Sequence, residues 1–316
     1  KKNSDDQNKG ERKDIIITTE RALITSIREE LKDLGLDIGI WGAGTRDLDH
    51  PVVLASVQAL EQNRNKDFKR LLPLDRIDLL LGDEADNYLT DKRKALINYL
   101  QAQVKIGLTA TPTWPDGRDI SEIWGEKIHE FSLKEGILKG VNVPPMFYLF
   151  EAQLDDSKLT IEYGDYENKV LSAAMKEAEI HKAIPEVYQR LVPKTQRKQF
   201  PTLVFVPSVN LVHDLTKSLR EQFSGEDISV QGWTGDSTST AHMKSDIVDF
   251  NDGRLDILVL CEMGGRGINL PRARCLIDAY PTLSPTKLEQ RHGRILRRIR
   301  ADSDLAQRGV RKNFAL

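Results

Sequence analysis

The chain is 316 residues long, which is enough for about two domains with a sizeable buried core. Hydrophobic residues make up 39% of it and charged residues 30%, as in an ordinary soluble globular protein. No apolar run approaches the length needed to cross a bilayer, so we expect no membrane partner. The formal net charge of −2 does not show whether the chain binds nucleic acid, because binding a polyanion requires a local basic face and not a basic total charge.

The cysteines and histidines carry little functional signal. Cys261 and Cys275 each lie within an apolar run and are expected to be buried free thiols, as in a reducing cytoplasm. No signal-peptide pattern opens the chain, so we predict a cytoplasmic location. The six histidines show no metal-ligand spacing with one another or with the cysteines, and no zinc site is predicted.

The first part of the chain alternates apolar strands with stretches of helical periodicity. Residues 1–13 are polar and charged and predict a mobile loop. A helical pattern over 21–35 ends at Gly35. The expected strands are 14–19, 37–41, 52–57, 77–82 and 105–109, and further helices are expected near 58–64, 91–102 and 119–126.

A second series of the same kind begins after Pro144 and Pro145. The polar stretch 152–167 predicts a surface excursion. The expected strands are 146–151, 202–206, 228–232, 256–261 and 275–279, and the expected helices are 168–192, 209–223, 240–251 and 286–298.

This repeated alternation predicts an α/β protein with two similar parallel-sheet lobes. Gly140, Pro144 and Pro145 cluster at the end of the first series and predict a hinge at about 140–146. We accordingly expect one domain over 1–143 and a second over 144–316. The abrupt first strand after Lys1 and the strand-like ending at 313–316 predict a piece of a longer protein, truncated at both ends.

Residues 76–86 read RIDLLLGDEAD, an apolar run that stops on two consecutive acids, Asp83 and Glu84. Such a run predicts a buried parallel strand, and open α/β sheets bind ligands outside the carboxyl ends of their strands. Adjacent carboxylates repel each other, and this cost is tolerated where a bound cation or a proton transfer requires both of them. The pattern favours a magnesium-dependent nucleotide site, with Asp83 near the metal and Glu84 near the attacking water. The alternative is a solvated strand end.

Three later segments add to this hypothesis. In GLTATP (107–112), Thr109 and Thr111 end a strand and can hydrogen-bond an acid on the neighbouring strand. In CEMGGRGINLP (261–271), Gly267 can take a positive φ and Asn269 can present its amide to a ribose hydroxyl. A plain turn and a glycine-rich surface loop are the respective alternatives.

The third segment is QRHGRILR (290–297), within an expected helix. Arg294 and Arg297 are three residues apart, so we expect them to share one helical face. Gly293 in mid-helix costs about 1 kcal/mol relative to alanine, which is easier to understand if something approaches closely there. Paired guanidinium groups suit the clamping of a phosphate, whereas the alternative is a solvated basic face.

Together these segments resemble the superfamily 2 helicases, the DEAD/DEAH-like nucleic-acid-dependent ATPases. In order and rough spacing they are similar to motifs II, III, V and VI of that family. Weaker matches to motifs Ia, Ib and IV extend the resemblance over about residues 14–298. The QxxGRxxR and GLTATP strings are closer to the motors of restriction systems (including type III enzymes) and DNA-repair systems than to strict DEAD-box RNA helicases.

The resemblance implies two RecA-like lobes with a cleft between them, and ATP and Mg²⁺ as cofactors. Asp83 would hold Mg²⁺, Glu84 would activate water, and Arg294 and Arg297 would be arginine fingers with Gln290 beside them. The nucleotide would be contacted, or its state transmitted, by Asp86, Thr109, Thr111, Gly267 and Asn269. The nucleic acid would be contacted by Thr18, Thr19, Ser56, Pro207, Ser208, Thr234, Gly235 and Cys261.

Three departures from the family pattern matter. Asn269 stands where the family has an acid, and Cys261 stands where it has a threonine. No GxxxxGK[ST] loop, the Walker A motif that cradles the β- and γ-phosphates, occurs in the 316 residues. We therefore expect the parent protein to be an ATPase and this piece alone to be inactive.

The resulting prediction is an ATP-dependent helicase or translocase core that moves along nucleic acid, with DNA favoured over RNA. Subunits or domains outside this chain are expected as further partners. Two alternatives stay open. One is the motor of a restriction or defence complex that translocates without unwinding, and the other is a non-hydrolysing nucleic-acid-binding protein without the phosphate loop.

Overall fold

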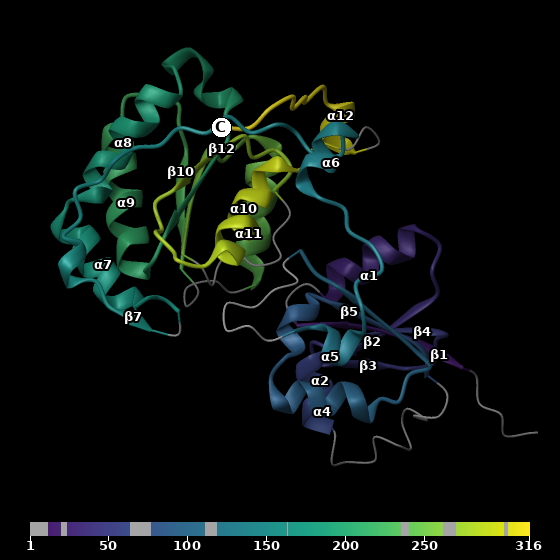
Figure 1. Cartoon of the computed structure of the whole chain (residues 1–316). Coiled ribbons are helices and arrows are strands. Elements are labelled where there is room, and N and C mark those ends of the chain that lie inside the picture. The colour runs from purple at the N-terminus through teal and green to yellow at the C-terminus, as the bar shows by residue number, and fades with distance from the viewer. Residues whose placement is uncertain are drawn as a thin grey trace, which may run out of the picture. The chain divides into compact units, whose positions relative to one another are not determined.

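The computed structural model describes residues 12–19, 24–63, 77–110, 119–162, 164–234, 240–261, 270–299 and 303–316. The chain forms two compact units, Lys1–His129 and Glu130–Leu316, each with its own sheet (Figure 1). The predicted α/β class with parallel sheets is confirmed. The division between the units falls after His129, whereas the expected domain boundary falls after residue 143.

The first unit contains a sheet with strand order β3-β2-β4-β1-β5-β6, parallel except for the pairing of β3 with β2. The expected strands lie within two residues of the observed ones, whereas β3 was not predicted. The elements are β1 (Lys13–Thr18), α1 (Ile24–Asp33), β2 (Ile38–Gly42), β3 (Thr45–Asp47), β4 (Val52–Ser56), α2 (Val57–Asn63), β5 (Ile77–Asp83), η3 (Ala85–Tyr88), α4 (Asp91–Tyr99), β6 (Val104–Leu108) and α5 (Ser121–Trp124).

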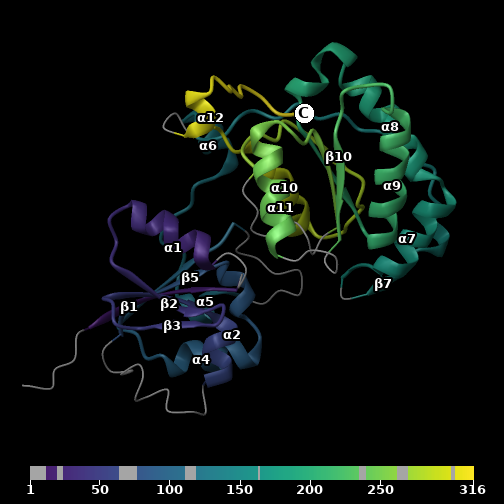
Figure 2. The same cartoon turned by 180° about the vertical axis from the view of Figure 1, so that it is seen from behind.

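Alternate side chains of β1 enter two cores, one on each face of this sheet. Ile15 and Ile17 are buried in the core that includes residues of α2 and α4. Ile16 points to the other face and packs against the cluster that contains Ile24 of α1. Figures 1 and 2 accordingly show α1 on one side of the sheet and α2 and α4 on the other. Burial on both faces explains the continuous apolar sequence of the strand.

The second unit contains a parallel sheet with strand order β10-β11-β9-β12 and a small antiparallel hairpin, β7-β8. Its elements are α6 (Leu133–Leu138), η4 (Asp156–Lys158), β7 (Ile161–Glu162), β8 (Asp165–Tyr166), α7 (Asn168–Glu177), α8 (Ile180–Leu191), η5 (Lys194–Gln199), β9 (Thr202–Val206), α9 (Val209–Gln222), β10 (Val230–Trp233), α10 (Thr240–Asp252), β11 (Ile257–Cys261), β12 (Cys275–Asp278), α11 (Pro285–Leu296) and α12 (Asp304–Gln307).

The helices of the second unit cover both faces of its sheet. Helices α8 and α9 lie on one side, and α10 and α11 lie on the other, as both views show (Figures 1 and 2). Strands β9 and β11 are buried at every residue, as expected for central parallel strands. Cys261 and Cys275 are buried free thiols, as predicted, and burial raises the pKa of Cys275 to about 12.

Two predictions of secondary structure in this unit were wrong. The single helix 168–192 is two helices, because Glu179 takes the left-handed conformation (φ 51°) and interrupts the helix between α7 and α8. The expected strand 146–151 is not a strand. Its first residue bonds Ala315 (Met146 N to O, 2.8 Å), but Phe147 and Leu149 are 73% and 95% exposed, and no strand pairing is described for 147–151.

No helix in the described ranges is long and apolar enough to cross a membrane. The predicted surface excursion at 152–167 contains the β7-β8 hairpin, and Asp165 of that hairpin accepts a 2.7 Å hydrogen bond from the Thr282 hydroxyl. Asp165 also forms a 3.0 Å ion pair with Lys287, so the hairpin holds the start of α11.

Candidate functional site

The two predicted acids of the first unit lie where β5 ends. Asp83 is the last residue of β5, and Glu84 follows it in the left-handed conformation (φ 50°, ψ 59°). The Glu84 carbonyl accepts a 2.9 Å hydrogen bond from the N–H of Asn87 in η3. Non-glycine residues rarely adopt this conformation, and such residues cluster at functional sites. The pair lies at the edge of the sheet where open α/β folds bind ligands.

Thr109 connects this turn to the neighbouring strand. It directly follows β6, and its hydroxyl donates a 2.7 Å hydrogen bond to the Asp86 carboxylate. Asp86 is 5% exposed, so this bond matters for its burial. The expected bond between a threonine after one strand and an acid after the next is therefore present.

Trp124 packs against the same turn and was not predicted. Its indole N–H donates a 3.2 Å hydrogen bond to the Ala85 carbonyl. A Cβ on Gly82 would lie 2.3 Å from the Trp124 ring, and one on Gly107 would lie 2.7 Å from it. Gly82 and Gly107 are paired between β5 and β6, so both strands need glycine where the indole lies. The two glycines on adjacent strands are the feature of the sequence from which a large side chain above them could have been predicted.

The Asp83 carboxyl suits a magnesium ion. Burial raises its pKa, a backbone hydrogen bond from Glu84 lowers it, and the charge of Asp86 raises it further. A bound cation would offset both unfavourable effects. Mg²⁺ takes hard oxygen ligands and typically uses one or two carboxylates together with water and substrate phosphates. Within the described ranges there is no cluster of three or more His, Cys, Asp or Glu side chains fit for a metal.

The residues predicted to contact nucleic acid lie at the carboxyl ends of strands, but most are buried. Thr18 and Ser56 are paired between β1 and β4, and each is 1% exposed. The Ser56 hydroxyl accepts a 3.2 Å hydrogen bond from the Ala59 N–H and so stabilises the start of α2. The Thr19 hydroxyl is buried without a hydrogen-bond partner among the described residues.

Most of the predicted nucleic-acid residues that are described in the second unit are also buried. Pro207 is buried, and the hydroxyl of Ser208 caps α9 by accepting from the Leu211 N–H. Thr234 directly follows β10 and is 3% exposed, and Cys261 ends the neighbouring β11 and is 6% exposed. Phosphate contacts at these positions would therefore rely on main-chain N–H groups more than on side chains.

Helix α11 carries the predicted Arg294, and another of its arginines, Arg291, is structural. Arg291 is 5% exposed and bonds the Asp278 carboxylate (Nε to Oδ2, 3.0 Å) and the Tyr280 carbonyl (Nη2 to O, 2.7 Å). Its guanidinium also lies 4.7 Å from the centre of the Tyr280 ring. These contacts tie α11 to the end of β12. Gln290 and Arg294 lie on the same helix and are half-buried.

Arg297 does not share a helical face with Arg294, contrary to the expectation. Helix α11 ends at Leu296, and Arg297 is extended (φ −64°, ψ 128°) and bridged to Asn142. The Leu296 carbonyl accepts a 2.9 Å hydrogen bond from the Val143 N–H, which explains the early end of the helix. A Cβ on Gly293 would meet nothing within 4 Å, so no described part of the chain explains glycine there.

Lys312 is a buried cation that was not predicted. It is 3% exposed, and its ammonium donates a 3.4 Å hydrogen bond to the carbonyl of Pro271, the last residue of the GRGINLP run. Burial lowers the pKa of Lys312 to about 7, and the charges of Arg274 and Arg297 lower it further. The residues adjacent to Lys312 in sequence contain no signal for this burial.

Four predicted site residues lie outside the residues that the structure describes. They are Thr111, Gly235, Gly267 and Asn269.

Comparison with known families supports the resemblance in both units. Residues 3–114 match the model of the type III restriction enzyme res subunit. Residues 182–298 match the helicase conserved C-terminal domain. A Saccharomyces cerevisiae relative named "Putative ATP-dependent helicase IRC3" is 26% identical over 303 residues, covering 92% of this chain. The chain spans 42% of the length of that relative.

Solved structures show the same fold. One is described as "the fragment structure of a putative HsdR subunit of a type I restriction enzyme" from Vibrio vulnificus. It has a TM-score of 0.69 and 18% identity, and covers 96% of this chain and 52% of its own. The ATP-dependent type ISP restriction-modification enzyme LlaBIII bound to DNA has a TM-score of 0.62 and 13% identity, over 97% of this chain and 24% of its own. With both family regions in order, this chain belongs to the superfamily 2 helicases and forms a helicase core.

Proposed function

We propose that the protein containing this chain hydrolyses ATP to move along a nucleic-acid strand. The observation that carries the proposal is the acidic turn of the first unit. Asp83 ends a parallel strand and Glu84 follows it, and the Asp86 carboxylate accepts a hydrogen bond from Thr109, which follows the next strand. Carboxylates held at one edge of a rigid sheet support the proposed roles in binding a metal and a water molecule.

The proposed roles follow from position and chemistry. Asp83 holds Mg²⁺, which when bound neutralises charge on the ATP phosphates. Glu84 orients the attacking water and accepts its proton, and Asp86 with Thr109 keeps the turn rigid. The second unit supplies Arg294 and Arg297 for the charge that develops on the γ-phosphate, with Gln290 beside them. Arginines in this role change phosphoryl-transfer rates by about 10³–10⁵-fold. Thr111, Gly267 and Asn269 complete the proposed nucleotide contacts.

The proposed nucleic-acid path uses the carboxyl ends of the strands in each unit. Thr18, Thr19 and Ser56 belong to the first unit, and Pro207, Ser208, Thr234, Gly235 and Cys261 belong to the second. Because most of the described side chains in this set are buried, main-chain contacts to phosphates would dominate. Such contacts are largely blind to base sequence, which suits a protein that moves along a strand.

The test is ATP hydrolysis by the full-length protein, measured alone and with single- and double-stranded DNA and RNA. We expect stimulation by nucleic acid, and stronger stimulation by DNA. This 316-residue chain contains no GxxxxGK[ST] loop, so by itself it should not turn over ATP. A full-length protein that binds nucleic acid but never hydrolyses ATP would support the non-hydrolysing alternative instead.

A second candidate is a restriction-type motor that translocates without separating strands. The match of residues 3–114 to the res subunit model favours it, as does the structural likeness to restriction enzymes. Displacement of a bound triplex strand without unwinding of a forked duplex would select this candidate. Unwinding of the fork would select the helicase.

A further inference from the structure

The hairpin β7-β8 contacts the segment that leads into α11, although Asp165 and Thr282 are 117 residues apart in sequence. The hairpin is itself tied to the body of the second unit. Tyr166 packs against the hydrophobic core, and the Thr160 hydroxyl donates a 2.8 Å hydrogen bond to the carboxylate of Glu167, which directly follows β8. The hairpin is therefore a support that can hold another part of the unit in place.

Four donors surround the carboxylate of Asp165. Its Oδ2 accepts a 2.7 Å hydrogen bond from the Thr282 hydroxyl and lies 3.0 Å from the Lys287 ammonium. Its Oδ1 accepts from the main-chain N–H groups of Leu283 at 2.8 Å and Tyr166 at 2.9 Å. Burial alone would raise the pKa of Asp165, but these hydrogen bonds lower it below the ordinary value. The carboxylate is thus ionised and bonded through both oxygens at neutral pH.

The donors from the other segment lie on both sides of the N-cap of α11. Ser284 is the N-cap, and its hydroxyl accepts a 3.4 Å hydrogen bond from the N–H of Lys287. The Ser284 N–H donates to the Thr282 hydroxyl at 3.0 Å, and that hydroxyl donates to Asp165. Hydrogen bonds in such a chain polarise one another. Asp165 consequently fixes the point at which the helix begins.

The start of α7 holds the other end of the same segment. The Tyr280 hydroxyl donates a 2.6 Å hydrogen bond to the side-chain oxygen of Asn168, the first residue of α7. The Tyr280 carbonyl accepts from Arg291, as described above. Segment 280–284 is therefore anchored at both ends, by α7 at Tyr280 and by the hairpin at Thr282 and Leu283.

These contacts bear on the predicted residues of α11. Arg291 fixes the middle of the helix and Asp165 fixes its start, so together they set the direction and the rotation of the helix. Lys287, which Asp165 holds, and Arg294 are seven residues apart, close to two turns, and so share one face. Gln290 lies one turn after Lys287. Without the anchor at its start, α11 could tilt and turn about Arg291 and carry Arg294 with it.

We propose that Asp165 is a positioning residue for α11: by holding the start of the helix, it places Arg294, with Gln290, for action on the γ-phosphate. The inference rests on the proposed function, because it gives Asp165 no chemistry of its own. A displacement of about 1 Å in a group that acts in the transition state can cost about 100-fold in rate. The hairpin, which contains none of the residues assigned to ATP or nucleic acid, would accordingly control the rate of hydrolysis.

The test uses Asp165→Asn in the full-length protein. This variant keeps the size of the side chain and the oxygen that accepts from Leu283 and Tyr166. It replaces the oxygen that binds Thr282 and Lys287 with an NH₂ group, which is only a donor. The change therefore removes the contacts to the start of α11 and leaves the remainder of the hairpin intact.

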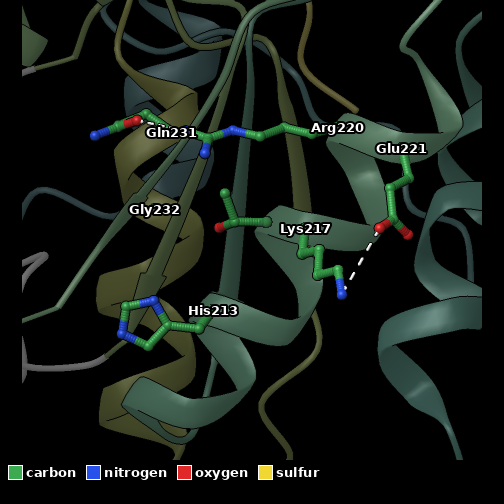
Figure 3. A pocket seen from close by; sticks show the side chains of 7 residues that line it. His213, Lys217, Arg220, Glu221, Gln231 and Gly232 are labelled. Atoms are coloured by element: carbon green, nitrogen blue, oxygen red, sulfur yellow. Dashed lines mark hydrogen bonds and ion pairs between the residues drawn. The ribbon is translucent and has the colours of Figure 1, made fainter.

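Glu221→Gln is the matched control. It removes the same charge from the second unit and breaks an ion pair with Lys217 (3.8 Å) on α9 (Figure 3). Both side chains of that pair are more than two-thirds exposed, and exposed pairs contribute little. Helix α9 lies on the opposite face of the sheet from α11 (Figures 1 and 2). This variant should therefore leave α11 and ATP hydrolysis unchanged.

Hydrogen exchange followed by mass spectrometry reports on the start of α11 without any need for ATP. Asp165→Asn should speed exchange in peptides that cover the first two turns of the helix by about tenfold, because it removes bonds to a charged group. Glu221→Gln should stay within about twofold of the native protein. Native exchange at α11 in Asp165→Asn would overturn the proposal.

Steady-state ATP hydrolysis with saturating nucleic acid tests the link to Arg294. Because an arginine in this role acts only as charge develops, Asp165→Asn should lower kcat about tenfold and change KM for ATP less than about twofold. In the Arg294→Ala background the same substitution should change kcat less than about twofold, since the residue through which it acts is absent. A further tenfold loss in that background would refute the positioning role.

The two measurements separate this inference from the proposed function. A native protein that does not hydrolyse ATP would refute the proposed function, while exchange at α11 would still decide whether Asp165 holds the helix. An active native protein with an equally active Asp165→Asn variant would refute the positioning role alone. Thr282→Val removes one of the four donors and should lower kcat about threefold, which keeps the test valid if Asp165→Asn lowers the melting temperature.

Discussion

The hydroxyl of Thr109 donates a 2.7 Å hydrogen bond to the carboxylate of Asp86, across 23 residues of sequence. The bond joins the segment after β6 to the turn after β5, and so links the two strand ends around the candidate catalytic acids. Asp86 is 5% exposed, so the loss of the Thr109 hydroxyl would leave a buried carboxylate with one hydrogen bond fewer.

Thr109→Val should therefore lower the free energy of unfolding of the first unit by about 1–2 kcal/mol. Thr109→Ser keeps the donor and should stay within about 0.5 kcal/mol of the native chain. Urea unfolding, with hydrogen exchange at β5 and β6 to identify the unit, measures the difference. Equal stability of the valine and serine variants would show that the bond contributes nothing.

Arg291 and Asp278 make the second testable contact. Arg291→Met leaves the Asp278 carboxylate, which also lies 3.3 Å from His292, without its main cation. Breaking a buried pair in this way costs about 3–5 kcal/mol. Arg298→Met is the matched control, because Arg298 is exposed and bonds only the Gly140 carbonyl among the contacts described for it. Similar urea midpoints for the two variants would refute a structural role for Arg291.

The lowered pKa of Lys312 predicts that the stability of the folded chain depends on pH. Its pKa in the folded chain is about 7, below the ordinary value of 10.5, so the unfolded chain binds the proton more tightly. Stability from this group therefore rises as the pH increases from about 7 toward 10.5. The native chain should gain about 2 kcal/mol between pH 7 and 9 relative to Lys312→Met. Parallel stability curves for the two proteins would contradict the lowered pKa.

A substitution at Gly293 tests whether packing or function requires a glycine at this position of α11. Because a Cβ at this position would meet nothing within 4 Å, Gly293→Ala should fit without strain and stabilise α11 by about 1 kcal/mol. If glycine is present because a ligand approaches, the same variant of the full-length protein should lose ATPase activity while its melting temperature rises. A more stable variant with full activity would leave the glycine without a functional reason.

Much of the framework was predictable from local sequence. The apolar runs located the strands within a few residues, because central parallel strands are buried on both faces. The position of Asp83 at a strand end and the contact between Thr109 and Asp86 followed from parallel pairing, which brings carboxyl ends to one edge. Buried cysteines followed from their apolar surroundings.

The errors arose where distant residues decide the local structure. Helix α11 ends before Arg297 because Asn142 and Val143, more than 150 residues earlier, pair with the chain there. The apolar segment 146–151 has strand composition, but a strand also requires neighbours to bond. Nothing in the sequence around Arg291 marks it as structural, and only the position of Asp278 shows that it is.

The proposed mechanism depends most on Glu84 as the residue that activates water. Glu84→Gln keeps the size of the side chain and the turn after β5 but removes the base. The most direct measurement is steady-state ATP hydrolysis by the full-length protein with saturating nucleic acid, alongside equilibrium binding of ATP. We predict that Glu84→Gln binds ATP normally and turns over at least about 100-fold more slowly. Turnover at the native rate in this variant would contradict the central claim.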